Sequence, residues 1–254
     1  MAVALGILIG LSLGLLGGGG SILTVPIFVY VFHFGPKEAI AMSLAVVGAT
    51  STVGAAGHWR AGNVNVRVGA VFGAVAMAGT YAGARLAVLL SGTAQLTIFG
   101  VVMLTAAAFM FRGRRADAAE RSSALVFGRT LAVVVFEALG VGLLTGVVGV
   151  GGGFLIVPAL VLLGLPMREA VGTSLAVIAT NCVVGVAGYI GRVQMDWTAV
   201  ALVTAGTVPG ITAGVYLHRF VPQQALRRAF SFFLVAVAVW ILYQNLSTAL
   251  ATRS

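Results

Sequence analysis

The sequence has little charge and almost no cysteine. Only 8% of its 254 residues are charged, whereas 60% are hydrophobic. A chain with this composition lacks the polar surface that a soluble globule of the same size needs, which excludes the soluble class. The one cysteine, Cys182, excludes an internal disulfide. The sequence therefore predicts a membrane protein that no internal disulfide stabilises.

Long apolar runs, by contrast, occur along the whole sequence. A helix needs about 20 residues to cross a bilayer. Apolar runs long enough to cross lie approximately at 2–34, 39–57, 68–90, 94–111, 130–165, 170–190, 197–217 and 229–246. The first run has no basic leader and no clear cleavage site, so we predict that it stays in the mature protein, with a signal peptide as the alternative. The predicted fold class is an all-α polytopic membrane protein.

Acidic residues are scarce, and the excess of Lys and Arg gives a formal net charge of +9. In a membrane protein such residues lie in loops and at helix ends, where they contact lipid phosphates, so no nucleic-acid partner is expected. The densest basic segment predicts a cytoplasmic linker at 112–128, which separates a first transmembrane repeat at 1–111 from a second at 129–254.

Glycine, unlike charge, is abundant, and it clusters at two matching places. The stretch "GLLGGGGSILTVP" at 14–26 returns as "GVVGVGGGFLIVP" at 146–158. The segments that follow, 26–59 and 158–190, also align. Their matched positions are Pro26 with Pro158, Glu38 with Glu169, Ser43 with Ser174, Thr50 with Asn181, and Gly57 with Gly188. Internal duplication of this kind is typical of secondary transporters.

Charge distribution favours an inverted arrangement of the two halves. Four simple crossings in each half would make the halves parallel and put nine of the 15 Lys and Arg residues on the side of the linker. A glycine-broken helix or re-entrant hairpin followed by three crossings would invert the halves and put eleven there. The positive-inside rule then places the linker in the cytoplasm and both termini outside, with parallel halves as the alternative.

The paired glycine motifs, each followed by a proline, a Glu-Ala segment and "SLAV", resemble the two repeats of the sulfite exporter TauE/SafE family of membrane permeases. The resemblance covers nearly the whole chain. It implies transport of small anions, chiefly sulfite and organosulfonates. The two loops are not identical, because Ser21 in the first stands where Gly153 stands in the second.

The glycine breaks predict an anion site. Each loop would end at a half-helix, beginning near Ser21 or Phe154, whose free N–H groups and positive dipole end attract an anion. Brought together, the two ends would hold sulfite or a sulfonate without a buried arginine. The substrate-binding residues predicted here are Gly17, Gly18, Gly19, Gly20, Ser21, Gly149, Gly151, Gly152 and Gly153. The alternative is that these glycines only allow close helix packing.

Polar side chains in the next crossing of each half extend this prediction. Ser43 and Thr50 share one helix face, as do Ser174 and Asn181, because each pair is separated by seven residues. We predict that these four residues and their neighbour Ser51 line the cavity. The alternative is that the hydroxyl groups bond to carbonyl groups of their own helix.

Three further residues have open roles. Glu137 is the one carboxylate within an apolar run and is a candidate for proton coupling, although it lies close enough to Arg129 to reach lipid headgroups instead. His58 precedes Trp59 near a helix end, which favours an interfacial anchor over a proton relay. Cys182 is interpreted as a small apolar filler.

The predicted function is a permease that moves a small anion, sulfite or an organosulfonate, across the inner membrane by alternating access. An anion channel and a permease for a carboxylate are the alternatives. No enzyme is expected, because "GVGGGF" has neither the acid of a dinucleotide site nor the lysine of a phosphate loop. The expected partners are the anion and the lipid bilayer, with a homodimer left open, and no cofactor or metal is implied.

Overall fold

The computed structural model describes residues 2–17, 21–112, 131–148, 153–218 and 220–251. Throughout these residues the regular structure is helical, which confirms the predicted all-α class. The elements are α1 (Ala2–Leu16), α2 (Ser21–Pro26), the π-helix η2 (Ile27–Val31), α3 (Pro36–Arg60), α4 (Val66–Ala87), α5 (Gly92–Arg112), α7 (Leu131–Val148), α8 (Gly153–Leu162), α9 (Met167–Tyr189), α10 (Trp197–His218) and α11 (Gln223–Ala251).

Four of the described helices, α3, α4, α9 and α10, are long and apolar enough to cross a membrane. The other apolar segments found among the described residues are shorter: Ala2–Leu16, Ser21–Val31, Gly92–Ala108, Val134–Val148 and Ser231–Gln244. At 1.5 Å per residue, the 15 residues of α1 reach about 22 Å, less than the roughly 30 Å of a hydrocarbon core. The chain therefore combines full crossings with helices that end inside the bundle.

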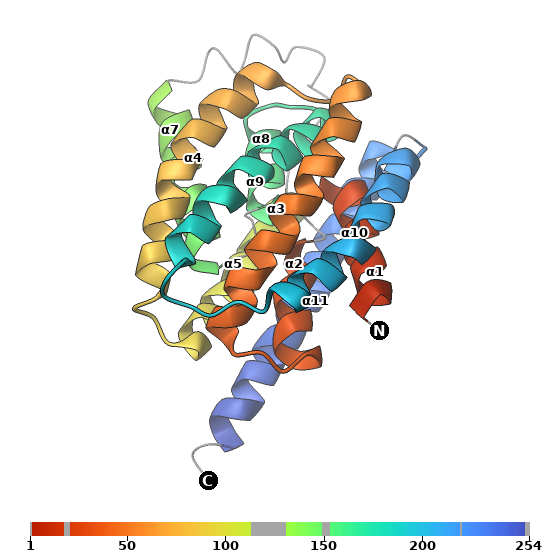
Figure 1. Cartoon of the computed structure of the whole chain (residues 1–254). Helices are drawn as coiled ribbons and strands as arrows, with labels where there is room; N and C mark the ends of the chain where they lie inside the picture. Colours follow the sequence, from red (N-terminus) through yellow and green to blue (C-terminus); the bar gives the residue numbers. More distant parts are fainter. Residues whose placement is uncertain (1, 18–20, 113–130, 149–152, 219, 252–254) are drawn as a thin grey trace.

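The centre of the bundle is formed by α3 and α9, which lie side by side (Figure 1). A methyl group added at Gly54 of α3 would lie 3.2 Å from Leu175 of α9. One added at Gly185 of α9 would lie 3.2 Å from Leu44 of α3. Residue numbers therefore rise on one helix as they fall on the other, so α3 and α9 are antiparallel.

On either side of this centre lies a pair of helices whose backbones touch, α1 with α10 and α4 with α7 (Figure 1). Glycines spaced four residues apart permit the contact, since a side chain there would overlap the backbone of the opposite helix. These glycines are Gly6, Gly10 and Gly14 on α1, Gly206, Gly210 and Gly214 on α10, Gly79 and Gly83 on α4, and Gly142 and Gly146 on α7. Each pair therefore joins one helix of the first predicted repeat to one helix of the second.

The helix directions define two ends of the bundle. At one end α3 and α10 finish while α4 and α9 begin. We call it the basic end, because Arg60, Arg67 and Arg168 lie there. At the opposite end, which we call the far end, α3 begins and α9 finishes at Tyr189. The predicted linker at 112–128 lies outside the described residues except for Arg112.

The helices described on either side of the two glycine stretches end and begin next to them, while residues 18–20 and 149–152 lie outside the described residues. Leu16 ends α1 and Ser21 begins α2, while Val148 ends α7 and Gly153 begins α8. The two prolines that follow differ. Pro26 closes α2 and is followed by the π-helical turn of η2, whereas Pro158 lies inside α8. A proline removes one helical hydrogen bond, and a π-turn is one way to absorb its loss.

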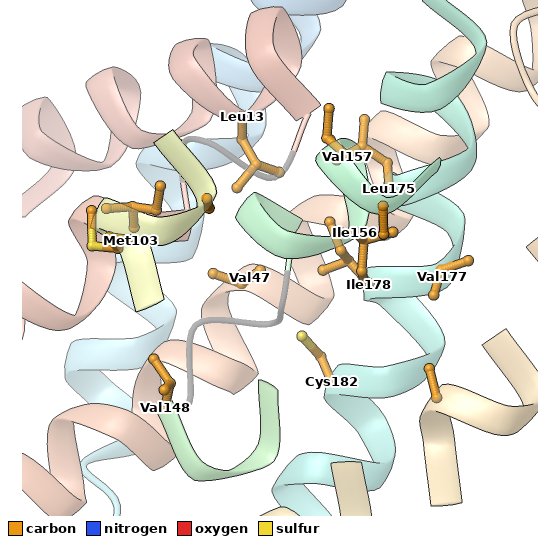
Figure 2. Close-up of a cluster of buried hydrophobic side chains, with 14 of the residues drawn as sticks. Leu13, Val47, Met103, Val148, Ile156, Val157, Leu175, Val177, Ile178 and Cys182 are labelled. Carbon is orange, nitrogen blue, oxygen red and sulfur yellow. The ribbon is translucent and has the colours of Figure 1, made fainter. Parts of the chain in front are cut away.

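The apolar core joins both halves (Figure 2). Leu13 of α1, Val47 of α3, Val148 of α7 and Ile178 of α9 belong to one buried cluster, which also contains Cys182. The Cys182 side chain is 1% exposed and lies among these apolar neighbours (Figure 2), as expected for a small filler.

Candidate functional site

The first glycine break packs directly against α9. Gly17 is buried and has a φ of +67°, a conformation that favours glycine. A methyl group there would lie 3.0 Å from Ser174 Oγ. Ser174 comes seven residues after the first residue of α9, so the break lies about 10 Å inside the basic end. Ser21, which opens α2, is fully buried, and the predicted site residues Gly18, Gly19 and Gly20 lie outside the described residues.

The second break lies towards the far end. The Tyr189 hydroxyl, at the end of α9, donates a hydrogen bond of 3.0 Å to the Gly146 carbonyl near the end of α7. Gly153 is buried at the start of α8, whereas Gly149, Gly151 and Gly152 lie outside the described residues. The ends of α1 and α7 therefore lie at different depths of the bundle, on either side of its middle, and do not meet at one level.

Three of the predicted hydroxyl groups bond to their own helices. Ser43 donates to the Ile40 carbonyl at 3.1 Å, and Ser174 donates to the Val171 carbonyl at 2.8 Å. Thr50 donates to the carbonyl of residue 46 at 2.7 Å. This is the arrangement that the sequence left as an alternative, and it occupies the hydrogen atoms that an anion would need.

Thr50 also links two elements. Its hydroxyl lies 2.5 Å from that of Thr207 on α10, and both residues are buried. The contact ties the central helix α3 to the α1–α10 pair. Position 181 of α9 aligns with Thr50, and the position that aligns with Thr207 is Ala76 of α4, which has no hydroxyl group. Asn181 therefore has no hydroxyl at the position that corresponds to the partner of Thr50.

Asn181 and Ser51 are the two predicted residues whose polar groups stay unpaired. Both amide atoms of Asn181 and the hydroxyl of Ser51 are fully buried and find no hydrogen-bond partner among the described residues. Both residues lie in the inner part of their helices, within three residues of the contact between Gly48 of α3 and Cys182 of α9. An unpaired buried amide costs about 1–3 kcal/mol, so a polar ligand would be a natural partner for Asn181.

Glu137 lies in the first two turns of α7 and is half-buried. Its neighbour Phe136 is 80% exposed on the outer surface of the bundle. A position near the start of a membrane helix is compatible with either of the two roles that the sequence left open, proton coupling or contact with lipid headgroups.

The structure corrects the prediction for His58. Its side chain is fully buried, whereas Trp59 is 59% exposed, so only the tryptophan has the exposure of an interfacial anchor. The imidazole lies against His218, the last residue of α10, with ring centroids 5.0 Å apart. The sequence does contain a signal, since His58 aligns with Tyr189, which also places a large polar ring against the carbonyl end of a broken helix.

With this geometry established, comparison with known proteins identifies the family. The model of the sulfite exporter TauE/SafE family matches residues 2–241. The chain belongs to the TauE/SafE family. A probable membrane transporter protein of Xylella fastidiosa strain 9a5c is 32% identical over 258 residues, covering 99% of this chain and 97% of that protein. No solved structure gives a significant match.

More distant relatives carry the same description. A probable membrane transporter protein of Bacillus subtilis, YdhB, is 28% identical over 229 residues, covering 87% of this chain and 91% of that protein. One from Methanocaldococcus jannaschii, MJ0441, is 27% identical over 198 residues, covering 75% and 72%. This TauE/SafE protein is therefore a membrane transporter, and the names of these relatives do not specify a substrate.

Proposed function

We propose that this TauE/SafE protein is a secondary transporter that carries a small oxyanion, sulfite or an organosulfonate, across the cytoplasmic membrane by alternating access. The single observation that carries the proposal is the buried, unpaired amide of Asn181 in the inner part of α9. An oxyanion would accept hydrogen bonds from this amide and from the Ser51 hydroxyl. Without a buried arginine in the site, binding would be weak enough for release.

The proposal includes two inverted repeats. Gly10 contacts the backbone of Thr207, and at the aligned positions of the other half Gly142 contacts the backbone of Ala76. Further contacts recur in the same way: Gly210 with Ile7 and Gly79 with Leu139, Gly214 with Leu11 and Gly83 with Leu143, and Gly57 with Val215 and Gly188 with Ala84. Together with the antiparallel α3 and α9, these matches support inversion, and the positive-inside rule orients the basic end to the cytoplasm.

The two helix breaks fit alternating access in this arrangement. The break after Leu16 lies nearer the basic end, and the break after Val148 lies nearer the far end. Each break would lie on the route that the anion takes to Asn181 from one side of the membrane. Backbone that leaves a helix at membrane depth is tolerated only where protein or a water-filled path satisfies it.

The test is transport into proteoliposomes of sulfite, sulfate, a two-carbon sulfonate and lactate, with counterflow measured for each. Saturable flux confined to the sulfur oxyanions is expected. Equal transport of lactate would contradict the substrate class, and flux without saturation or counterflow would indicate a channel.

A variant at position 181 tests the site itself. Asn181→Leu should raise the KM for the transported anion by about tenfold or more, since a hydrogen bond to a charged group contributes about 1.5–3 kcal/mol. It should also raise the melting temperature, because an unpaired amide leaves the core. The matched control is Thr180→Val, since Thr180 is exposed and bonds only within α9. An unchanged KM in Asn181→Leu would make Asn181 a packing residue.

A further inference from the structure

The carbonyl groups at the ends of α1 and α7 are satisfied by side chains from other helices. At the end of α1, His58 Nε2 lies 3.4 Å from the Gly14 carbonyl and His218 Nδ1 lies 2.8 Å from the Leu15 carbonyl. A carbonyl oxygen can only accept, so each imidazole carries its hydrogen on the nitrogen that faces α1. The last carbonyls of a helix have no partner within it, which explains why both rings are held there.

At the end of α7 the aligned carbonyls have partners of different chemistry. The Tyr189 hydroxyl donates to Gly146, and Gln95 Nε2 donates to Val147 at 3.2 Å. A phenol and an amide keep one protonation state around neutral pH, whereas an imidazole gains or loses a proton there. The two helix ends therefore have equivalent hydrogen bonds, but only the α1 end can change its charge.

The two histidines are placed to share one proton. Their ring planes are inclined by 80° and both side chains are at most 1% exposed. His58 Nδ1 and His218 Nε2 are buried and find no partner among the described residues. Each of these nitrogens has a free lone pair, because the opposite nitrogen carries the hydrogen. The pair therefore offers two acceptor positions for a proton in one closed site.

The surrounding charges limit the pair to a single proton. The negative end of the α1 dipole favours an imidazolium, whereas two imidazolium rings at this separation would repel each other. On α9, the positive charge of Arg168 disfavours a proton on His218, and Glu169 follows Arg168 in the sequence. On α3, Arg60 follows His58 by two residues. The described part of α1 has no titratable side chain, and on α10 the nearest is the exposed Tyr216.

We propose that His58 and His218 form a proton-binding pair that couples anion transport to the movement of one proton. The pair holds the end of α1 immediately before the first glycine break, so its charge changes beside the path of the anion. One proton is taken up with the anion from the solution on one side, rests on a ring nitrogen, and is released with the anion on the other side. This inference rests on the proposed function, because coupling requires a transported anion.

The experiment measures accumulation of a radiolabelled two-carbon sulfonate in proteoliposomes under a pH gradient, alongside counterflow without a gradient. A sulfonate is chosen because its own charge stays constant over about pH 5–8, the range in which imidazole titrates. The test variant is His58→Tyr with His218→Gln, which copies the chemistry of the α7 end. The matched control is Tyr189→Phe, which changes the corresponding ring at the far end.

The wild type and Tyr189→Phe should accumulate the sulfonate when a pH gradient is imposed. The double variant should lose about tenfold in gradient-driven accumulation, a typical coupling factor. Its counterflow should fall by less than about threefold, the effect of one weakened hydrogen bond. The single variant His218→Gln, which keeps a donor to Leu15, should show the same imbalance and serves if the double variant does not fold.

Each other outcome removes a defined part of the inference. Gradient-driven accumulation that survives in the variants would overturn the coupling role of the pair. Equal loss of accumulation and counterflow would show a structural role instead. Wild-type counterflow with no response to a pH gradient would overturn coupling and leave the proposed function standing, whereas no wild-type transport of any anion in the panel would remove both.

Discussion

The ends of α1 and α7 invite comparison, because the same backbone problem is solved there by different side chains. Both helices stop inside the bundle and leave carbonyl groups that need donors. Two imidazoles supply the donors for α1, and a phenol and an amide supply them for α7. Many ring and amide donors can satisfy a carbonyl, so this requirement leaves the chemistry of the donor open. The α1 end is thereby the one at which charge can vary.

The glycine contacts of the same two helices show the opposite behaviour. Along α1 and α7 the glycines face the partner backbone at aligned positions in both halves. Backbone contact admits no side chain, so glycine stands in both halves at Gly10 with Gly142 and at Gly14 with Gly146, whereas Gly6 aligns with Ala138. The comparison therefore separates positions that fix the architecture from positions that can acquire a function.

The largest expected effect is at these backbone contacts. Gly142→Val should abolish folded protein, because a branched side chain would overlap the Ala76 backbone and force α4 and α7 apart. Gly10→Val should do the same through the backbone of Thr207. The measurement is the monodisperse fraction after detergent extraction.

The control lies on the same helix. Gly140 has open space around it, so Gly140→Val should leave the folded fraction unchanged. A normal folded fraction for Gly10→Val together with a loss of folded protein for Gly142→Val would contradict the comparison, since it would show that the two glycine contacts are not equivalent.

A smaller effect is expected at the far-end cap. Tyr189→Phe removes the hydroxyl that donates to Gly146 and should lower the free energy of unfolding by about 1–3 kcal/mol, because the carbonyl is left without that donor. The loss should be the same across pH 5–8, to within about 0.5 kcal/mol, since the lost group does not titrate in that range. Thermal unfolding in detergent at several pH values measures it. A loss that varied strongly with pH would show that the far end also carries a titrating group.

The smallest effect is expected where the halves differ within the core. Thr207→Ala removes the hydroxyl beside Thr50 and gives position 207, in the second repeat, the residue found at the aligned position, Ala76, in the first. Thr50 keeps its bond to its own helix, so the free energy of unfolding should fall by only about 1 kcal/mol. The same thermal assay measures this loss. A change above about 3 kcal/mol would show that this contact determines how α3 and α10 pack.

The sequence predicted the first helix break well, because glycine runs and long apolar runs act locally. Leu16 and Ser21 bound the first break within the predicted stretch. The depth of each break within the bundle could not be predicted from the local sequence. Whether two breaks meet depends on how far α1 and α7 slide along their partners, which contacts between distant glycines decide.

The candidate site was predicted in part for a similar reason. The seven-residue spacing grouped Ser43 with Thr50 and Ser174 with Asn181, but spacing does not reveal whether a hydroxyl bonds to its own helix. His58 was misplaced because a histidine near a helix end normally reaches the membrane surface. In the folded chain α1 and His218 cover it, and this contact involves a residue too distant in sequence for local patterns to predict.

The packing of helices of one half against helices of the other has a consequence for biosynthesis. The Leu15 carbonyl waits for a donor on His218, 203 residues later in the chain. At about 5–20 residues per second the ribosome needs on the order of 10–40 s to make that segment. During this time the glycine face of α1 is in the membrane without its partner helix. The first half is therefore not expected to fold by itself, and the bundle stays incomplete in the membrane until α10 is inserted.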